Sequence, residues 1–492
     1  MTRSYARASR VAGVVNETPT AAPDILHTAF FHIFPAIRVA MQPADLLILP
    51  RWLLPIAPVN VALEGQAVAV AAGRIVAVGP VAELEARFDA RERISRGSHV
   101  LLPGFVNAHT RASMGLLRGL PVYPPVLRWL RETVWPAERN VSPDFVREGT
   151  QLAIAEMLRA GITAFADSYL FPEEAARAAA DARVRAVIGL PVAETASHWA
   201  PNSAAHFDRA AHLWDEYKTD PWVSLYFAPP PAYAIGDSML ARLRSVADEL
   251  DARIAMPLHE TELEVRDSVG QHGARPLQRL AKLGLLRPGF TAVHMNRLDA
   301  GDLELARSTG ISVVACPQSN LRLGNGSCPV AELLQRNVTV GLGSDSPVSS
   351  GAFDLLAEAR LAALLSASAE GVSPQHADAA GQEESRGISA ADALNCATLG
   401  GAMALGLGSI CGSIEPGKAA DLICIDLASL SCRSFASIAE TVLFGATRQD
   451  VTDVWTGGRA AVSESRLLAY DERQLLQQAR QWTDRVQPGA LE

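Results

Sequence analysis

Short apolar runs alternate with helix-like segments through the middle of the chain. Eight of these runs are nearly continuous in apolar residues, which is typical of strands buried on both faces. They occupy residues 100–109, 163–168, 185–192, 223–229, 253–260, 290–296, 312–319 and 339–346. Between them apolar residues recur with helical spacing, most clearly after Ser142, a predicted N-cap that precedes Pro143, with Gly161 ending the helix. Eight strand–helix units over about 250 residues predict a closed parallel (β/α)8 TIM barrel with its helices outside.

Two further patterns concern the fold class and the chain ends. A doubly wound open sheet is the alternative α/β fold, but no Gly-x-Gly-x-x-Gly follows the first strand. Near both ends, short alternating runs turn on glycines, as in VALEGQAVAV, AAGRIVAVG, GSIEPGKAADLICIDL and VTDVWTGGRAAVSES. We expect the two ends to fold together into one small β-domain, and residues 471–492 to form a C-terminal helix and tail.

The first 40 residues differ in character from the rest. Residues 1–24 are rich in Arg, Ala, Ser and Thr, and residues 25–40 are apolar but interrupted by histidines and a proline. This composition lacks the continuous apolar segment of a signal peptide, although a targeting peptide is the alternative. We expect a poorly ordered extension or an overlong gene start before Met41. The polar segment 369–387 is expected to be a surface excursion.

Composition and charge narrow the class of protein. Hydrophobic residues make up 49% and charged residues 20%, which is typical of a globular protein. No apolar run reaches the roughly 18 residues that span a bilayer. The net charge of -9 is spread along the chain, which argues against nucleic acid or an anionic membrane and favours a small neutral or cationic ligand. Six cysteines without a C-x-x-C pair indicate a reducing, cytoplasmic compartment.

Reactive groups in such barrels lie at the carboxyl ends of the strands. The first strand ends at His109, the fifth at His259 and Glu260, the sixth at His294 and the eighth at Asp345. Imidazoles and a carboxylate at one mouth are typical of a metal site, and a nearby glutamate can be a general base. A lone histidine is more often a structural, hydrogen-bonded residue, but four such strand ends on one rim favour a functional site.

These residues lie in motifs that resemble the amidohydrolase superfamily, and within it the branch of triazine chlorohydrolases and S-adenosylhomocysteine/methylthioadenosine deaminases. The segment PGFVNAHTRASMGLLRGL resembles PG-x-VN-x-HTH-x-x-M-x-LLRG of that branch, and VWPAE, LHET, AVHMN, CPQSNLRLGNGSCPV and LGSD are also similar. The resemblance runs from Met41 to about Arg485. It implies a barrel over 99–410, a composite β-sandwich from 41–98 and 411–470, one zinc or iron ion, and hydrolytic removal of an amino or chloro group from a nitrogen heterocycle.

The resemblance also implies roles for individual residues. The expected metal ligands that this chain keeps are His109 and Asp345. The expected catalytic residues are the proton-shuttling Glu260, the water-orienting His294 and Asp345 itself. The expected substrate-binding residues are Glu138, at the position that holds ribose in adenosine-type deaminases, and Ser319 and Asn320 of the CPQSN motif.

Four positions depart from the family pattern. Arg111 stands where the second ligand histidine is expected, and Pro257, in MPLHET, stands where the third is expected. Pro230 and Ala315 replace two further pocket histidines, and the tail DSPVSS lacks the usual asparagines. A catalytic zinc needs about three protein ligands, and neither arginine nor proline can supply one. We therefore expect no metal, or a weakly bound one, where the resemblance implies zinc or iron.

Without the metal, hydrolysis loses its main source of activation. Water that is not bound to metal forfeits on the order of 10 kcal/mol of nucleophile activation. General bases such as Glu260 and His294 supply only about 3 to 6 kcal/mol. We therefore expect the standard metal-dependent activity to be lost or strongly weakened, with Arg111 paired to Asp345 in place of the metal.

Three alternatives remain open from the sequence. In the first, which we favour, the protein binds a small heterocyclic or nucleoside-like ligand without turnover. In the second, it is an active hydrolase with a rebuilt site, in which His259 reaches a displaced metal together with His109 and Asp345. In the third, it is a noncatalytic subunit that associates with an active relative. The expected assembly is a homo-oligomer or a complex with such a relative.

Overall fold

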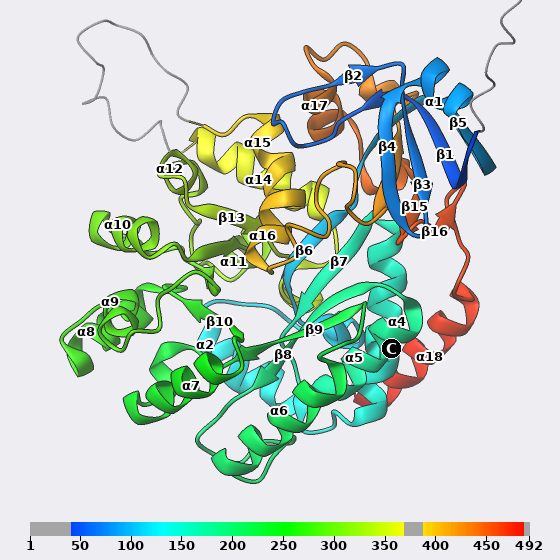
Figure 1. Cartoon of the computed structure of the whole chain (residues 1–492). Coiled ribbons are helices and arrows are strands. Elements are labelled where there is room, and N and C mark those ends of the chain that lie inside the picture. The colour runs from blue at the N-terminus through cyan, green and yellow to red at the C-terminus, as the bar shows by residue number, and fades with distance from the viewer. Residues whose placement is uncertain (1–40, 369–386, 487–492) are drawn as a thin grey trace, which may run out of the picture. The chain divides into compact units, whose positions relative to one another are not determined.

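The computed structural model describes residues 41–368 and 387–486, which form two β-sheets with helices around them (Figure 1). The expectations for residues 1–40, for 369–386 of the polar segment and for the tail beyond residue 486 fall outside the described part of the chain. Within the described residues, no helix is long and apolar enough to cross a membrane.

The first sheet is the predicted parallel barrel. Its eight strands pair in chain order: β6 (Phe105–Thr110), β7 (Ile162–Asp167), β8 (Arg185–Pro191), β9 (Val223–Ala228), β10 (Arg253–Leu258), β11 (Phe290–His294), β12 (Ser312–Ala315) and β13 (Thr339–Leu342). The ring closes through a parallel bridge between Thr110 and Asp345, and the Asp345 N–H donates to the His109 carbonyl at 3.0 Å. The Asn107 side chain adds hydrogen bonds to Ser344 at 2.7 and 2.9 Å. All eight predicted strands are therefore present, and the barrel prediction is confirmed.

Helices follow the strands and cover the outside of the barrel (Figure 1). The longest, α4 (Pro143–Arg159), starts as predicted, since the Ser142 hydroxyl accepts the Phe145 N–H at 3.2 Å. The others around the barrel include α5 (Pro172–Ala182), α6 (Ser203–Tyr217), α7 (Asp237–Glu249), α8 (Glu262–His272), α9 (Pro276–Lys282), α10 (Ala300–Thr309), α11 (Pro317–Arg322), α12 (Val330–Gln335), α14 (Leu355–Ser368) and α15 (Ala390–Asn395).

The second sheet is built from both chain ends, as predicted. Its strands are β1 (Gln42–Leu53), β2 (Leu63–Glu64), β3 (Gln66–Ala71), β4 (Arg74–Pro80), β5 (Phe88–Pro103), β14 (Leu422–Asp426), β15 (Val451–Thr456), β16 (Arg459–Ser463) and β17 (Arg466–Leu467). Strand β5 joins the two ends, because it runs parallel to β1 and antiparallel to β14. One apolar cluster, which includes Leu46, Val68, Leu101, Leu422 and Trp455, draws residues from both ends.

The first predicted strand, 100–109, is divided between the two sheets. Its first residues belong to β5, where Leu101 pairs with Cys424, and β6 starts only after Gly104. A Cβ at Gly104 would lie 2.0 Å from the Thr163 hydroxyl oxygen, so the chain can cross from one sheet to the other here only as glycine. The apolar run is continuous because both halves are buried, and hydrophobicity alone therefore does not reveal the break.

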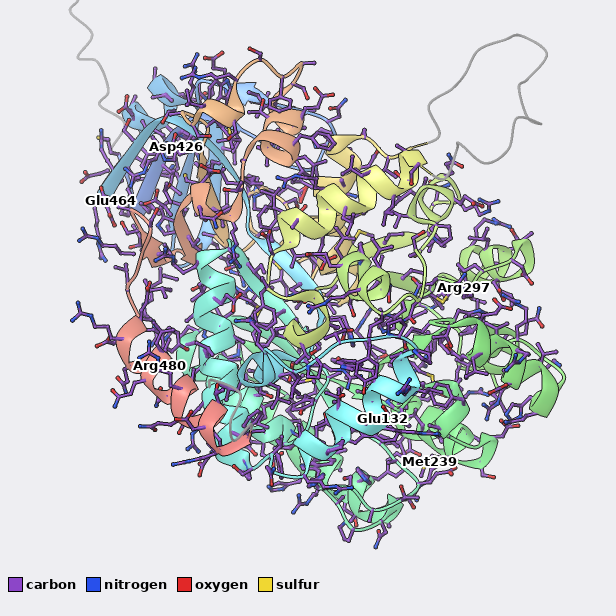
Figure 2. The ribbon with its side chains drawn as sticks, turned by 180° about the vertical axis from the view of Figure 1, so that it is seen from behind. Glu132, Met239, Arg297, Asp426, Glu464 and Arg480 are labelled. Carbon is purple, nitrogen blue, oxygen red and sulfur yellow. The ribbon has the colours of Figure 1, made fainter. Side chains whose placement is uncertain are left out.

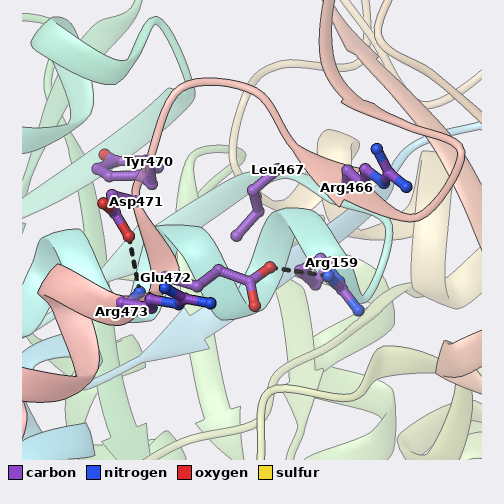
Figure 3. A pocket seen from close by; sticks show the side chains of 7 residues that line it. All are labelled: Arg159, Arg466, Leu467, Tyr470, Asp471, Glu472 and Arg473. Carbon is purple, nitrogen blue, oxygen red and sulfur yellow. Dashed lines mark hydrogen bonds and ion pairs between the residues drawn. The ribbon is translucent and has the colours of Figure 1, made fainter.

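Helix α18 (Glu472–Val486) packs against α4 near the C-terminal end of the described chain. The Trp482 indole donates to Glu148 at 2.8 Å and its ring meets Phe145 edge-on at 5.3 Å. Arg159 of α4 pairs with Glu472 at 2.8 Å across a surface hollow of ≈ 560 Å³ (Figure 3). These contacts fasten the helix to the outside of the barrel, and the hollow shares no lining residue with the cavity at the strand ends.

Candidate active site

Closure of the barrel brings together predicted residues that lie in β6, in β11 and just after β13. His109 Nε2 lies 3.6 Å from Asp345 Oδ1. The rings of His109 and His294 meet edge-on, with centroids 5.9 Å apart. Both imidazoles are buried, and His109 Nε2 and His294 Nδ1 have no hydrogen-bond partner among the described residues.

Asp345 is an ionised carboxylate held from several sides. Its Oδ2 accepts a hydrogen bond of 2.7 Å from the Ser319 hydroxyl and lies 3.4 Å from that of Ser349. Burial alone would raise the pKa of Asp345, but the contact with His109 and the nearby His294 and Arg111 hold the pKa well below its usual range. Ser319, which donates to this carboxylate, does not line the cavity.

Arg111 supplies the cation of the site. Its Nε lies 3.7 Å from Asp345 Oδ1, so the expected ion pair is present, and its side chain is 34% exposed. Burial alone would lower the pKa of Arg111, but the carboxylates of Asp345, Glu138 and Glu260 outweigh this effect and raise it. The guanidinium thus stands among three acidic side chains and stays protonated.

Two of those acidic side chains face the cavity. Burial raises the pKa of Glu138 above its usual value, although the charge of Arg111 and the nearby Tyr169 hydroxyl act in the opposite direction. Glu260 Oε1 accepts a hydrogen bond of 2.8 Å from the Asn325 amide. Asn320 lies further back, where its amide donates to Asn296 at 2.9 Å. Glu138 and Glu260 are therefore placed to meet a ligand, whereas Asn320 supports the neighbouring loop.

A cavity of ≈ 580 Å³ opens at the strand ends. Its polar lining includes His109, Arg111, Glu138 and Glu260, but not Asp345, which lies behind Arg111. Apolar and aromatic residues complete the wall, among them Val126, Leu130, Trp135, Tyr169, Trp199, Tyr233, Pro230 and Pro257. Leu130 belongs to η2 (Leu130–Val134), the segment that carries Glu132 in Figure 2. The volume is in the range of about 300 to 1,000 Å³ that holds small molecules.

His259 does not face the cavity. Its Nε2 accepts the Leu277 N–H at 3.0 Å, and its Nδ1 lies 3.1 Å from the carbonyl of Arg297, a residue labelled in Figure 2. Burial lowers the pKa of His259, so the ring is neutral and Nδ1 donates to that carbonyl. Both nitrogens are occupied. A metal could bind His259 only if one of these buried hydrogen bonds broke.

The residues present do not fit a catalytic zinc site. No three His, Cys, Asp or Glu side chains in the described part of the chain are grouped closely enough to hold a metal ion. The positions of the second and third expected ligands carry Arg111 and Pro257, which have no electron pair to donate. The guanidinium also places a positive charge beside Asp345, where a metal ion would meet electrostatic repulsion.

Some residues of the site were missed by sequence reasoning. The Asp167 carboxylate accepts the Ala112 N–H at 2.6 Å and so fixes the turn that follows Arg111. Asp167 is the last residue of β7 and the last but one of the predicted strand 163–168, so the rule that reactive groups lie at strand ends could have identified it. Asn325 lies in a loop and Ser349 in the short helix α13 (Pro347–Ser350), and neither carries a comparable signal.

The closed parallel barrel, with polar side chains collected at the carboxyl ends of its strands, is the architecture of a class of proteins that carry their sites at this rim. A sequence model of the Amidohydrolase family matches residues 100–461, and the chain belongs to that family. It is 36% identical over 446 residues to the 5-methylthioadenosine/S-adenosylhomocysteine deaminase of Saccharophagus degradans, covering 90% of this chain and 97% of the relative. The same-named deaminase of Teredinibacter turnerae is 36% identical over 436 residues, covering 88% and 96%.

Solved structures agree with this placement. An adenosine deaminase from Xanthomonas campestris with bound zinc has a TM-score of 0.87 and 40% identity, covering 91% of this chain and 99% of that one. The zinc complex of the atrazine chlorohydrolase TrzN from Arthrobacter aurescens has a TM-score of 0.80 at 22% identity, covering 89% and 99%, which supports the fold alone. The family resemblance predicted from the motifs is confirmed.

Proposed function

We propose that this amidohydrolase-family protein binds a small heterocyclic or nucleoside-like ligand in the barrel cavity and has lost, or strongly weakened, the metal-dependent hydrolysis of the family. The observation that carries the proposal is the ion pair between Arg111 and Asp345, at 3.7 Å. A guanidinium cannot deprotonate in a protein, so Arg111 cannot coordinate a metal ion at this position. Its positive charge instead compensates the Asp345 carboxylate.

The site is electrostatically complete without a metal. A buried carboxylate left unpaired costs about 3 to 5 kcal/mol, which a metal ion would normally offset. Here Arg111 provides the compensating charge and Ser319 a hydrogen bond of 2.7 Å. The fold therefore does not need a metal for stability at this position.

The cavity suits a flat, polar heterocycle. The exposed aromatic side chains of Trp135 and Tyr233 can stack on such a ring, and the Glu138 carboxylate can accept hydrogen bonds from sugar hydroxyls. The deaminase names of the relatives suggest an adenosine-type nucleoside as the nearest ligand class. The rebuilt hydrolase that would use His259 is less well supported, because both ring nitrogens are already hydrogen-bonded.

We also propose an orientation for the heterocycle bound in the cavity. In a deaminase, the ring carbon that bears the amino group must face the residues that activate water, and the proton-shuttling carboxylate must face the adjacent ring nitrogen. In this chain Arg111 and His109 would take the first of these positions and Glu260 the second, and all three line the cavity. The exocyclic substituent of a bound heterocycle would then meet Arg111.

Ligand binding and metal content together test the proposal. Thermal unfolding is measured with adenosine, inosine and their 5'-methylthio derivatives, and bound metal is measured by elemental analysis of the untreated protein. Saturating a binding site at about 100 times its Kd adds about 2.7 kcal/mol of stability. We expect stabilisation by at least one nucleoside, metal well below one per chain and no deamination. Full metal occupancy with turnover would contradict the proposal, as would the absence of stabilisation by every nucleoside.

A further inference from the structure

We infer that the cavity selects the oxo form of its heterocyclic ligand over the amino form, so that a 6-oxopurine nucleoside binds in preference to the matching 6-aminopurine nucleoside. This inference rests on the proposed function and its ligand orientation. It reverses the preference expected of a deaminase, which must bind the amino compound in order to act on it.

The first reason is that Arg111 offers only hydrogen-bond donors. A guanidinium has several N–H groups and no acceptor. Its contact with Asp345 is 3.7 Å long, which is an ion pair and too long for a hydrogen bond, so its N–H groups remain available to a ligand. Asp345 itself does not line the cavity. A substituent pointing toward β6 and β13 therefore meets donors.

The second reason is that Glu260 offers an acceptor nearby. Its Oε1 already accepts from Asn325 at 2.8 Å, which fixes the carboxylate and leaves Oε2 for a ligand. Glu260 lines the same cavity as Arg111, and its charge acts on the guanidinium. An ionised carboxylate accepts hydrogen bonds and donates none.

A lactam edge complements this pair, whereas an amino edge opposes it. In a 6-oxopurine the carbonyl oxygen accepts from Arg111 and the adjacent ring N–H donates to Glu260. In a 6-aminopurine the amino group directs its hydrogens at Arg111, and the ring nitrogen directs its lone pair at Glu260. The first contact then sets donor against donor, and the second sets acceptor against acceptor. Neither charged group is satisfied by the ligand, and binding sites discriminate against such a ligand.

The test compares nucleosides that differ only at the 6-position. Dissociation constants are measured by titration calorimetry for inosine against adenosine, and for 5'-methylthioinosine against 5'-methylthioadenosine. Because Arg111 is partly exposed, we expect a preference for the oxo member of about tenfold or more, at the low end of the cost of an unsatisfied polar group.

Three variants assign the preference to its source. Arg111→Met removes the donors and keeps an apolar stem, and should reduce the preference to the part that Glu260 contributes. Glu260→Gln leaves Asp345 untouched and presents an amide that can donate or accept, so it should reduce the preference even if the first variant folds poorly. The matched control is Arg118→Met, since Arg118 pairs with Glu156 at 2.8 Å and does not line the cavity; its preference should equal that of the parent.

The outcomes separate this inference from the proposed function. Equal or tighter binding of the amino nucleosides by the metal-free protein overturns the inference and leaves the binding function standing. A preference that is undiminished in both Arg111→Met and Glu260→Gln overturns it as well, as does its loss in Arg118→Met. Failure to bind any of the four nucleosides, or metal-dependent turnover of adenosine, overturns the proposed function itself.

Discussion

Replacing Arg111 by methionine should destabilise the protein because it strands the carboxylate of Asp345. The two side chains are 3.7 Å apart, which corresponds to roughly 4 to 5 kcal/mol of attraction at an effective dielectric of about 20. The Arg111 side chain is 34% exposed and Ser319 still donates to Asp345, so solvent and that hydrogen bond recover much of this energy. We expect a net loss of about 1 to 2 kcal/mol in the free energy of unfolding.

A double-mutant cycle measures this interaction directly. Urea unfolding at neutral pH, followed by tryptophan fluorescence, is compared for the parent, Arg111→Met, Asp345→Asn and the double variant. Asp345→Asn in the Arg111→Met background should regain stability, because it removes the unpaired charge, and the coupling energy should be about 1 kcal/mol. A coupling near zero, or an Arg111→Met variant as stable as its parent, would show that Arg111 does not compensate Asp345 and would refute the reasoning.

Three further predictions concern the surroundings of the site. His259→Ala should cost about 2 to 3 kcal/mol in unfolding free energy, because the Leu277 N–H and the Arg297 carbonyl lose a buried partner, while nucleoside affinity changes little; a large loss of affinity at unchanged stability would contradict this. Gly104→Ala should reduce soluble, folded protein sharply, since its Cβ would lie 2.0 Å from the Thr163 hydroxyl oxygen; normal yield and melting temperature would contradict the assigned contact. Burial raises the pKa of Glu358, whose carboxylate accepts two hydrogen bonds of 3.0 Å from Gln318, to about 8. The protonated form of Glu358 therefore contributes stability that is complete below the unfolded pKa of about 4.3 and is lost as the pH rises toward 8. Because glutamine does not ionise, Glu358→Gln should gain stability relative to the parent between pH 5 and 8. A stability difference that stays constant over this range would contradict the prediction.

The sequence predicts most of the fold because strands buried on both faces leave long apolar runs. Those runs place His109, Glu260, His294 and Asp345 at the same ends of their strands, and the rim of the barrel follows from the rule for parallel barrels. The division at Gly104 is not visible in the same pattern, because the residues on both sides of it are buried.

The direction of individual side chains is harder to predict. Alternation along a strand places His259 on the same face as Pro257. Strand β10 ends at Leu258, however, and His259 adopts a left-handed φ of 51°, so alternation no longer applies and the ring turns toward Arg297 and Leu277. The partner of Arg111 is easier to predict, because a guanidinium beside a buried carboxylate pairs with it.

The most direct test of the central claim is the metal content of the protein as it is purified, without added metal or chelator. With Arg111 and Pro257 in the positions of two ligands, elemental analysis should find zinc and iron well below one per chain, and dialysis against a chelator should leave the melting temperature unchanged. One zinc or iron ion per chain that survives dialysis, together with deamination of an adenosine-type nucleoside, would contradict the account.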